Sequence, residues 1–527
     1  MATGAGAPLL AALLAIQTLL WVAQGELVAV YSLQRHGARN ALPKGILLTE
    51  GDLIGGPTLL PRGQRMTYDA GVAFRQRYIN SSTCGSTCLV GSTATGDATS
   101  AVQYGVIGQA GVGFGNFDVY VRSSALDRSI MSGLCFLNGI WPADPSVATP
   151  QSYLPTGATV VPVYTQADSD DILIRAYTKC PAYQSALEAW FRSDEFRAKE
   201  NETQPLRDSV KAAMPYTGTN LTNWWNVYDS INVYRTYGVG QPTPNFTDVQ
   251  FNNIQAVAFW LETRKMDSAL TSNLLGGTIL ADLISSLQQA ATTFTTGSKL
   301  YYKLLSLSGH YNTQLGLLSA LAIDKLPGAM AVLPWYRAIP RLAAVLAFEL
   351  HALPAAGSET PAFYVRLVAQ DGPDRNYTTV PLPCAAGADA NGAVVGVLGT
   401  GACAMQDFVD FVQPRALTAG QWCAACGNRA VAACRLQELT TAAAAQQNAS
   451  GNSSSSGGGS SSGSGGCEDW QIAVAVVVPL VGTALLAAAG WAVWRWWQGR
   501  RSGASKSQAV DAGYGGMGPV GPQFTSI

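Results

Sequence analysis

One stretch, from Leu27 to Asn40, constrains the fold more than any other part of the sequence. It begins with an apolar, β-rich run and ends in a basic cluster made of Arg35, His36, Gly37, Ala38 and Arg39. Such a run predicts a buried strand, and open α/β sheets bind ligands at the carboxyl ends of their strands. Guanidinium groups suit phosphate oxygens, and an imidazole can act as a nucleophile. The alternative interpretation is a strand followed by a basic surface loop.

Composition limits the classes of protein to consider. The 527 residues carry a formal net charge of −1, and only 13% of them are charged. Nucleic acid is therefore not an expected partner, because no global positive field would attract it, and any basic site must be local. The length allows two or three domains.

The amino-terminal segment indicates secretion. An apolar run from Leu9 to Val22 is short for a membrane span, and Ala23 and Gly25 are spaced like a signal-peptidase site. We therefore predict a signal peptide over residues 1–25, with a retained anchor helix as the alternative. Ten cysteines and several Asn-X-Ser/Thr sequons indicate an oxidising, glycosylating compartment. The sequons start at Asn80, Asn201, Asn220, Asn245, Asn376, Asn448 and Asn452.

Two further segments place basic residues at strand ends. Residues 117–124 alternate in polarity and predict a strand that carries Arg122, and residues 129–139 predict the helix that follows. Residues 303–310 form another apolar run, which ends in His310. Because a parallel α/β sheet gathers the carboxyl ends of its strands at one edge, we expect the basic side chains of these strands to meet.

These segments resemble the signatures of the histidine acid phosphatases. Residues 35–39 match R-H-G-x-R, residues 122–128 match R-S-[ST]-x-x-x-R, and residues 63–78 match the family's helix after its first motif. The segment S-G-H-Y-N-T at residues 308–313 resembles S-x-H-D-x-T, and L-A-F-E-L-H further on resembles the family's late F-E-L strand. The resemblance implies an α/β fold: a mostly parallel sheet flanked by helices, with a mostly helical cap inserted at about residues 143–300.

The resemblance also implies a phosphate pocket made of three arginines and two histidines. Arg35, Arg39 and Arg122 would bind the phosphoryl group, and His310 would donate to one of its equatorial oxygens. His36 would attack phosphorus and carry a phosphohistidine that water then hydrolyses. Neither a metal nor a cofactor is expected, since the arginines supply the positive charge.

Other residues of these segments are interpreted as structural. Asp127 and Arg128 are expected to support the start of a helix, and His351 is expected to be a strand-end or surface histidine without a catalytic part. Trp224 and Trp225 either line the groove of the cap or belong to its core.

One position departs from the pattern, because Tyr311 stands where the family has an aspartate that protonates the leaving group. A phenol has an unperturbed pKa of about 10, which matches an acidic working pH poorly. Three possibilities follow. Tyr311 acts as a weak acid, a carboxylate of the cap replaces it, or the protein binds phosphoesters and turns them over slowly.

The carboxyl-terminal part of the chain predicts a membrane anchor. A phosphatase-like domain over residues 26–445 is followed by a Ser/Gly-rich linker over 446–470. Residues 471–494 carry no charge and are long enough to span a bilayer as a transmembrane helix. Arginines follow at once, which places the tail, residues 495–527, in the cytoplasm. The surroundings of Tyr514 resemble a sorting signal that an adaptor would bind.

The cysteines favour disulfides over metal sites. Cys84 and Cys88 are expected to pair with each other, and a second group is expected to form disulfides whose pairing the spacing does not assign. This group is Cys384, Cys403, Cys423, Cys426 and Cys434. Its C-x-x-C element leaves zinc or redox chemistry as the alternative.

Together these features predict a single-pass type I membrane protein, lysosomal, vacuolar or at the cell surface, whose lumenal or extracellular domain is an acid phosphatase. Its substrate would be a small phosphate monoester, and it could form a homodimer. The alternatives are a phosphatase-like receptor that binds phosphoesters with impaired turnover, and a phytase. Phosphoglycerate mutase relatives share the R-H-G start, but a signal peptide and an anchor fit cytosolic glycolysis badly.

Overall fold

The computed structural model describes residues 25–42, 56–80, 82–89, 118–143, 160–215, 218–240, 242–298, 301–355 and 357–452. The predicted signal peptide except Gly25, the predicted span over 471–494 and the tail with Tyr514 lie outside these residues, as does most of the predicted linker. Within the described ranges, no helix is both long enough and apolar enough to cross a membrane.

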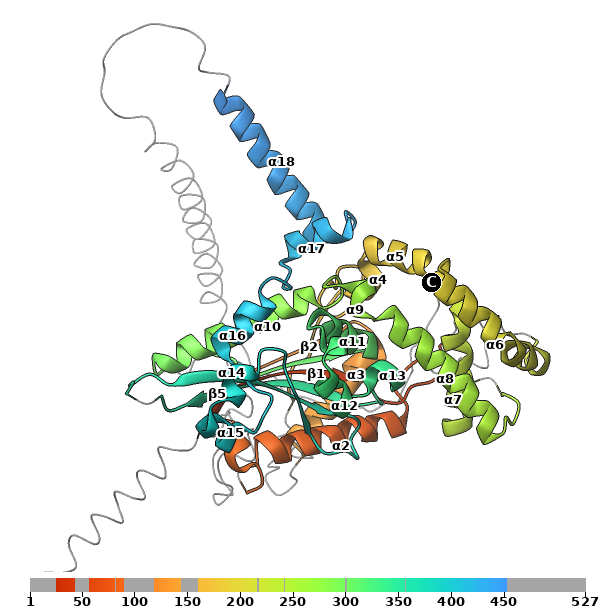
Figure 1. Cartoon of the computed structure of the whole chain (residues 1–527), viewed down its shortest axis with the longest axis horizontal. Coiled ribbons are helices and arrows are strands. Elements are labelled where there is room, and N and C mark those ends of the chain that lie inside the picture. Colours follow the sequence, from red (N-terminus) through yellow and green to blue (C-terminus); the bar gives the residue numbers. More distant parts are fainter. Residues whose placement is uncertain are drawn as a thin grey trace, which may run out of the picture. The chain divides into compact units, whose positions relative to one another are not determined.

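Eight strands form one sheet in the part of the chain that the structure describes (Figure 1). Their order is β3-β2-β4-β1-β5-β6-β7, and β8 pairs with β6. The strands are β1 (Glu26–Arg35), β2 (Val119–Ser124), β3 (Tyr164–Gln166), β4 (Leu304–Gly309), β5 (Val345–Leu353), β6 (Ala362–Gln370), β7 (Thr378–Val380) and β8 (Cys403–Ala404). The strands predicted over residues 117–124 and 303–310 are β2 and β4.

The sheet is mixed, so the prediction of a mostly parallel sheet was wrong. Strands β3, β2, β4 and β1 are parallel to one another, whereas β5 to β8 pair antiparallel with their neighbours. The reason lies in the connections. A parallel pair needs a crossover of a dozen or more residues, and residues 354–361 are too few for that, so β6 returns antiparallel beside β5.

The helices are α2 (Pro61–Tyr78), α3 (Asp127–Ile140), α4 (Ala176–Lys179), α5 (Pro181–Phe191), α6 (Asp194–Ala213), α7 (Trp224–Tyr237), α8 (Asp248–Lys265), α9 (Ser268–Thr271), α10 (Gly277–Thr295), α11 (Tyr311–Ala320), α12 (Pro327–Val332), α13 (Trp335–Ala338), α14 (Ala386–Asp389), α15 (Gly392–Leu398), α16 (Met405–Val412), α17 (Ala419–Cys426) and α18 (Ala432–Asn452). Three short 3₁₀ turns, at Gly85–Thr87, Leu221–Asn223 and Ile323–Lys325, complete the described elements.

Helices cover both faces of the sheet, which explains why β1 reads as a nearly continuous apolar run. On one face α2 and α3 pack together, and the rings of Phe74 and Phe136 meet edge to face with centroids 5.3 Å apart. The other face is covered by helices that include α10 and α16 (Figure 1). There the hydroxyl of Tyr31 donates to Asp282 of α10 at 2.7 Å and ties the central strand to that helix.

A group of helices with its own apolar core forms the cap. Helices α6, α7 and α8 lie together beside the sheet domain, and their core holds the fully buried Trp224 (Figure 1). Helix α8 begins at a capping box, in which Thr247 and Gln250 satisfy each other's backbone N–H groups. Helix α10, which falls in the range assigned to the cap, packs on the sheet instead.

His351 corrects another expectation, because it is neither at a strand end nor at the surface. It lies inside β5, is buried, and its Nε2 lies 3.2 Å from a carboxylate oxygen of Glu349. Glu349 also accepts hydrogen bonds from Arg77, Tyr78 and Arg366. A buried carboxylate needs such partners, and these hold its pKa below the usual range although burial opposes them.

The disulfides agree with the prediction that the cysteines pair. Cys84 joins Cys88, and the second group of cysteines contains the pairs 384–403 and 423–434. Cys426 pairs with Cys180, so a bond links α17 to the residue that precedes α5. Among the described cysteines, Cys135 is free and half-buried.

Candidate active site

Two neighbouring strands end in histidines that face each other. In the parallel pair β1 and β4, Arg35 lies opposite Gly309, so His36 and His310 both follow directly after their strands. The backbone N–H of His36 donates to Gly309 O at 3.0 Å. The two rings have centroids 5.5 Å apart at an interplanar angle of 67°, and both side chains are buried.

The loop after β1 is fixed by close backbone packing. A Cβ added to Gly37 would lie 2.3 Å from the carbonyl oxygen of Gly63 at the start of α2, so only glycine fits there. The N–H of Gly37 donates to Oγ of Ser132 on α3 at 3.0 Å. Both helices therefore hold the position of His36.

The surroundings of His36 prepare one ring nitrogen for attack. Its Nδ1 lies 2.8 Å from Gly37 O, and since a carbonyl only accepts, Nδ1 carries the proton. The lone pair of the ring is then on Nε2. Burial lowers the pKa of His36 well below its usual value, and the charge of Arg128 is the next cause. Burial therefore favours the neutral imidazole while the site is empty.

His310 is held in a similar state. Its Nε2 lies 3.0 Å from Oγ of Ser124, the last residue of β2. Burial lowers its pKa well below the usual value, followed by the charges of Arg128 and Arg175. If the Ser124 hydroxyl donates to Nε2, the other ring nitrogen of His310 carries a proton that it can donate.

Arg35 and Arg39 line a cavity together with His36, whereas His310 is not among its lining residues. Arg35 donates to Pro340 O, and its guanidinium lies over the ring of Tyr311, 5.0 Å from the centroid. Burial lowers the pKa of Arg35 to about 10, so the side chain stays charged at neutral and acidic pH. Arg39 binds the carboxylate of Asp229 with two hydrogen bonds of 3.0 Å each. Asp229 belongs to α7, so this pair joins the cap to the loop after β1.

Arg122 is not brought to the histidines. It lies two residues before the end of β2, about 7 Å back along the strand. There its Nη2 donates to Asp171 at 2.9 Å and to Gln166 at 2.7 Å. It does not line the cavity that Arg35 and Arg39 share. The geometry therefore does not fit the role predicted for it from the sequence.

Arg128 is the arginine whose charge acts most strongly on both histidines, although it is not among the residues that line the cavity and the sequence suggested only support of a helix start. It is the second residue of α3, which follows β2, and among the neighbouring charges it lowers the pKa of both histidines most. Burial and then the charge of Arg39 lower its own pKa to about 10. Its buried Nε has no hydrogen-bond partner among the described residues. A signal was present in the sequence, since the first turn of a helix after such a strand also faces the strand ends.

Tyr311 turns its hydroxyl away from this cavity. The hydroxyl donates to Oε2 of Glu262 on α8 at 2.6 Å, and Glu262 is also paired with Lys265. Burial and then the charge of Glu262 raise the pKa of Tyr311 well above its usual value. Tyr311 is buried and is not among the residues that line the cavity. A phenol in this setting releases a proton less readily than a free one.

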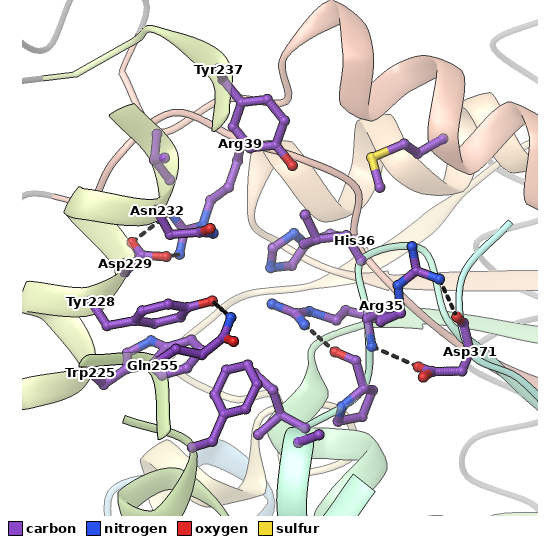
Figure 2. Close-up of a pocket in the computed structure, with 18 residues that line it drawn as sticks. Arg35, His36, Arg39, Trp225, Tyr228, Asp229, Asn232, Tyr237, Gln255 and Asp371 are labelled. Carbon is purple, nitrogen blue, oxygen red and sulfur yellow. Dashed lines mark hydrogen bonds and ion pairs between the residues drawn. The ribbon is translucent and has the colours of Figure 1, made fainter. Parts of the chain in front are cut away.

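The cavity has a volume of about 400 Å³ and lies between the loop after β1 and the cap (Figure 2). Asp229 and Asn232 of α7 lie across it from His36 (Figure 2). Its wall also includes the aromatic residues Trp225, Tyr228, Tyr237 and Phe259. Trp225 thus lines the groove, whereas Trp224 is core. Sequence reasoning missed Asp229 and Gln255, because nothing in the pattern of a cap helix shows which side chains face a distant loop.

No cluster of three or more histidine, cysteine or acidic side chains is placed to hold a metal ion in the described ranges.

Comparison with known proteins gives a consistent result for most of the chain. The model of the "Histidine phosphatase superfamily (branch 2)" matches residues 26–370. Lysosomal acid phosphatase of Xenopus laevis is 25% identical over 318 residues, which cover 59% of this chain and 64% of that protein. The human lysosomal acid phosphatase is 28% identical over 211 residues, 39% of this chain and 48% of the relative. The chain thus matches less than two thirds of the length of these relatives. Among solved structures, the apo form of Hafnia alvei phytase is 14% identical with a TM-score of 0.46, and the match covers 76% of this chain and 98% of that one.

Proposed function

The chain belongs to branch 2 of the histidine phosphatase superfamily, and we propose that it hydrolyses phosphate monoesters through a phosphohistidine formed on His36. The observation that carries the proposal is the state of His36. Its Nδ1 proton is engaged by Gly37 O, so the lone pair on Nε2 is available in a cavity lined by Arg35 and Arg39. A neutral imidazole with a free lone pair is a competent nucleophile at acidic pH.

Each remaining group has a part in this mechanism. Arg35, Arg39 and Arg128 neutralise the transferring phosphoryl group, and His310 donates to one of its equatorial oxygens. Three guanidinium groups supply the charge stabilisation that a metal ion gives in other phosphoryl-transfer enzymes, so we propose a metal-independent reaction. Water then attacks the phosphohistidine and releases inorganic phosphate.

A direct assay tests this function. The purified protein is incubated with p-nitrophenyl phosphate from acidic to neutral pH, and phosphate release is followed. We expect turnover that is highest at acidic pH and is inhibited by inorganic phosphate. An aryl leaving group needs little protonation, so no release at any pH would contradict the proposal. Binding of phosphate without release would instead support the phosphatase-like receptor that position 311 suggested.

The charges of the cavity favour a substrate with one phosphate over a polyphosphate. Among the described residues, the arginines that line it are Arg35, Arg39 and Arg341, and no lysine does. Arg128 does not line it and acts through its charge on both histidines. Arg341 is paired with Asp374 at 2.8 Å, and Asp229 and Asp371 add negative charge to the wall. A second or third phosphate on the substrate would meet these carboxylates, so we place a phytase activity second.

The location of the protein is part of the same proposal. We propose a type I membrane protein with a lumenal catalytic domain, destined for the lysosome or a similar compartment. Four sequon residues, Asn201, Asn220, Asn245 and Asn376, are exposed and Asn80 is half-buried, which supports glycosylation at the exposed ones. The disulfides support an oxidising compartment. Homodimer formation and an adaptor at Tyr514 stay predictions.

A further inference from the structure

We propose that Asp229, on cap helix α7, is the acid that protonates the leaving group. This inference rests on the proposed phosphatase function and adds the proton donor that position 311 lacks. Asp229 would be a catalytic residue from the cap, whereas the sequence resemblance places the donor beside His310.

The hydroxyl of Tyr311 is already engaged in a hydrogen bond outside the cavity. Its hydroxyl proton is donated to Glu262 at 2.6 Å, and its side chain does not line the cavity. Glu262 in turn is buried behind Tyr311 and paired with Lys265. Neither Tyr311 nor Glu262 is among the residues that line the cavity.

The direction of the reaction determines where the leaving oxygen lies. In phosphoryl transfer the attacking and leaving atoms lie roughly in line on opposite sides of phosphorus. Nε2 of His36 attacks from the loop after β1, so the leaving oxygen points across the cavity toward α7, where Figure 2 shows Asp229 and Asn232. The other carboxylate of the wall, Asp371, accepts from the backbone N–H of Arg341 at 2.8 Å and lies on the opposite side of the view from α7.

Phosphate binding would change the partners of the Asp229 carboxylate. In the empty site both of its oxygens accept from Arg39, and the two side chains are only 12% and 7% exposed. A bound phosphate competes for the guanidinium of Arg39. The carboxylate then loses its bidentate partner and faces a dianion, and both changes favour its protonated form.

The charged groups around Asp229 are compatible with its carrying a proton when phosphate is bound. Arg39 approaches from the loop after β1, and Arg35 and Arg128 act on it from the sheet side. Tyr228 and Tyr237 lie on α7 itself. All three arginines are expected to contact the phosphate, so their charge is compensated when the substrate is bound, and the two phenols are neutral at acidic pH.

The proton balance is complete without a further reagent. Nε2 of His36 uses its lone pair to form a bond to phosphorus, and the bond from phosphorus to the ester oxygen breaks with its electron pair on oxygen. The carboxyl of Asp229 gives its proton to that oxygen, and the alcohol leaves. Water then attacks phosphorus and gives a proton to the Asp229 carboxylate, while the electron pair of the P–N bond returns to His36.

The test compares two leaving groups in the full-length protein. Wild type and Asp229→Asn are assayed with glycerol phosphate, whose leaving alcohol needs a proton, and with p-nitrophenyl phosphate, whose leaving group does not. General acid catalysis contributes about 10²–10⁴-fold, so we expect kcat for glycerol phosphate to fall by about 10²-fold or more. We expect kcat for p-nitrophenyl phosphate to fall by about tenfold or less. In wild type we expect kcat for glycerol phosphate to decline as pH rises, and we expect this decline to disappear in the variant.

A purely structural role for Asp229, in holding Arg39, gives a different result. Both substrates would then lose activity by the same factor, and that result would overturn the inference. Asp371→Asn is the matched control, because it removes the other carboxylate of the wall and should leave the ratio between the substrates unchanged. If Asp229→Asn does not fold, Asp229→Glu keeps the test open, since it retains an acid and should preserve much of the glycerol phosphate activity. If wild type hydrolyses p-nitrophenyl phosphate and Asp229→Asn leaves the ratio between the two substrates unchanged, the result contradicts only the role of Asp229. If wild type hydrolyses neither substrate, the result contradicts the phosphatase function itself.

Discussion

The hydroxyl of Tyr311 donates a hydrogen bond of 2.6 Å to Oε2 of Glu262. Tyr311 begins α11 directly after the histidine at the end of β4, and Glu262 lies near the end of cap helix α8. The bond therefore joins α11, which follows β4, to cap helix α8. Position 311 thus contributes a contact between α11 and the cap, and we propose that the proton for the leaving group comes from another residue.

Tyr311→Phe should affect stability more than catalysis. The substitution leaves the buried carboxylate of Glu262 with Lys265 as its remaining ion partner, and an unsatisfied buried acceptor costs about 1–3 kcal/mol. We expect the free energy of unfolding, measured by urea denaturation, to fall by about that amount. The rate with glycerol phosphate should stay within about twofold of wild type. A large loss with glycerol phosphate but not with p-nitrophenyl phosphate would identify Tyr311 as the acid after all.

Arg128 and Arg122 should differ when each is replaced by methionine. Arg128→Met removes the charge that acts most strongly on both histidines, and we expect kcat/KM for p-nitrophenyl phosphate to fall by about 10²-fold or more, with weaker inhibition by inorganic phosphate. Arg122→Met should keep kcat/KM near wild type and lower stability, because it removes the partner of the buried Asp171. Kinetics and urea denaturation of both variants check the contrast. Loss of phosphate binding in Arg122→Met would restore the role predicted from the sequence.

His36→Ala should abolish the covalent intermediate. Wild type mixed rapidly with labelled substrate and quenched in base should carry a phosphoryl group that is lost in acid, as expected for a phosphohistidine. The variant should carry none, and its kcat should fall by at least about 10³-fold. His351→Gln is the control, since His351 pairs with Leu27 near the start of β1 and so lies at the opposite end of the strand. A label that survives in His36→Ala would place the nucleophile elsewhere.

Acid should destabilise the empty protein, and phosphate should oppose this effect. Burial lowers the pKa of His36, His310 and His351 in the folded state, whereas the unfolded chain takes up protons at about pH 6.5. The unfolded state therefore binds more protons below that pH, and stability falls as pH decreases. The melting temperature should drop between about pH 7 and pH 5, and less so with phosphate, whose charge favours protonated imidazoles. A melting temperature that rises on acidification would contradict this linkage.

Inositol hexakisphosphate should be a poorer substrate than p-nitrophenyl phosphate. The cavity holds few free cations, because Arg341 is paired with Asp374 and Asp229 adds negative charge. We expect kcat/KM for the polyphosphate to be lower by about tenfold or more at the same pH. Competition between the two substrates in one reaction measures the ratio directly. Equal or higher values for the polyphosphate would favour a phytase.

Individual residues show which parts of the site could be predicted from the sequence and which could not. His36 and His310 could be placed together because both follow apolar strands, and strand ends meet at one edge of a sheet. The choice between Arg122 and Arg128 could not be made in this way. It depends on where β2 stops, because Arg122 lies two residues before that end and is paired with Asp171. The antiparallel half of the sheet was missed because no strand was predicted over residues 362–370, where β6 returns beside β5 after a short connection.

The part of the site contributed by the cap was beyond such reasoning. Asp229 reaches Arg39 across 190 positions of sequence, and its helix shows no pattern that marks it as part of a site. The direction of the Tyr311 hydroxyl likewise depends on Glu262, which lies on another helix. Contacts of this kind follow from how the cap is seated on the sheet domain. The cap is held by many small interactions that no single motif records.

The burial of all three histidines has a consequence for how the molecule meets its surroundings. The sequence contains only His36, His310 and His351, and each of them is enclosed by other side chains. Imidazole is the side chain whose ordinary titration falls between about pH 5 and pH 8, so the exterior gains little charge across that range. When such a protein passes from neutral to acidic fluid, the electrostatic interaction of its surface with other molecules would therefore change little. Acidity would instead affect the protein through its buried histidines, two of which belong to the proposed phosphate site.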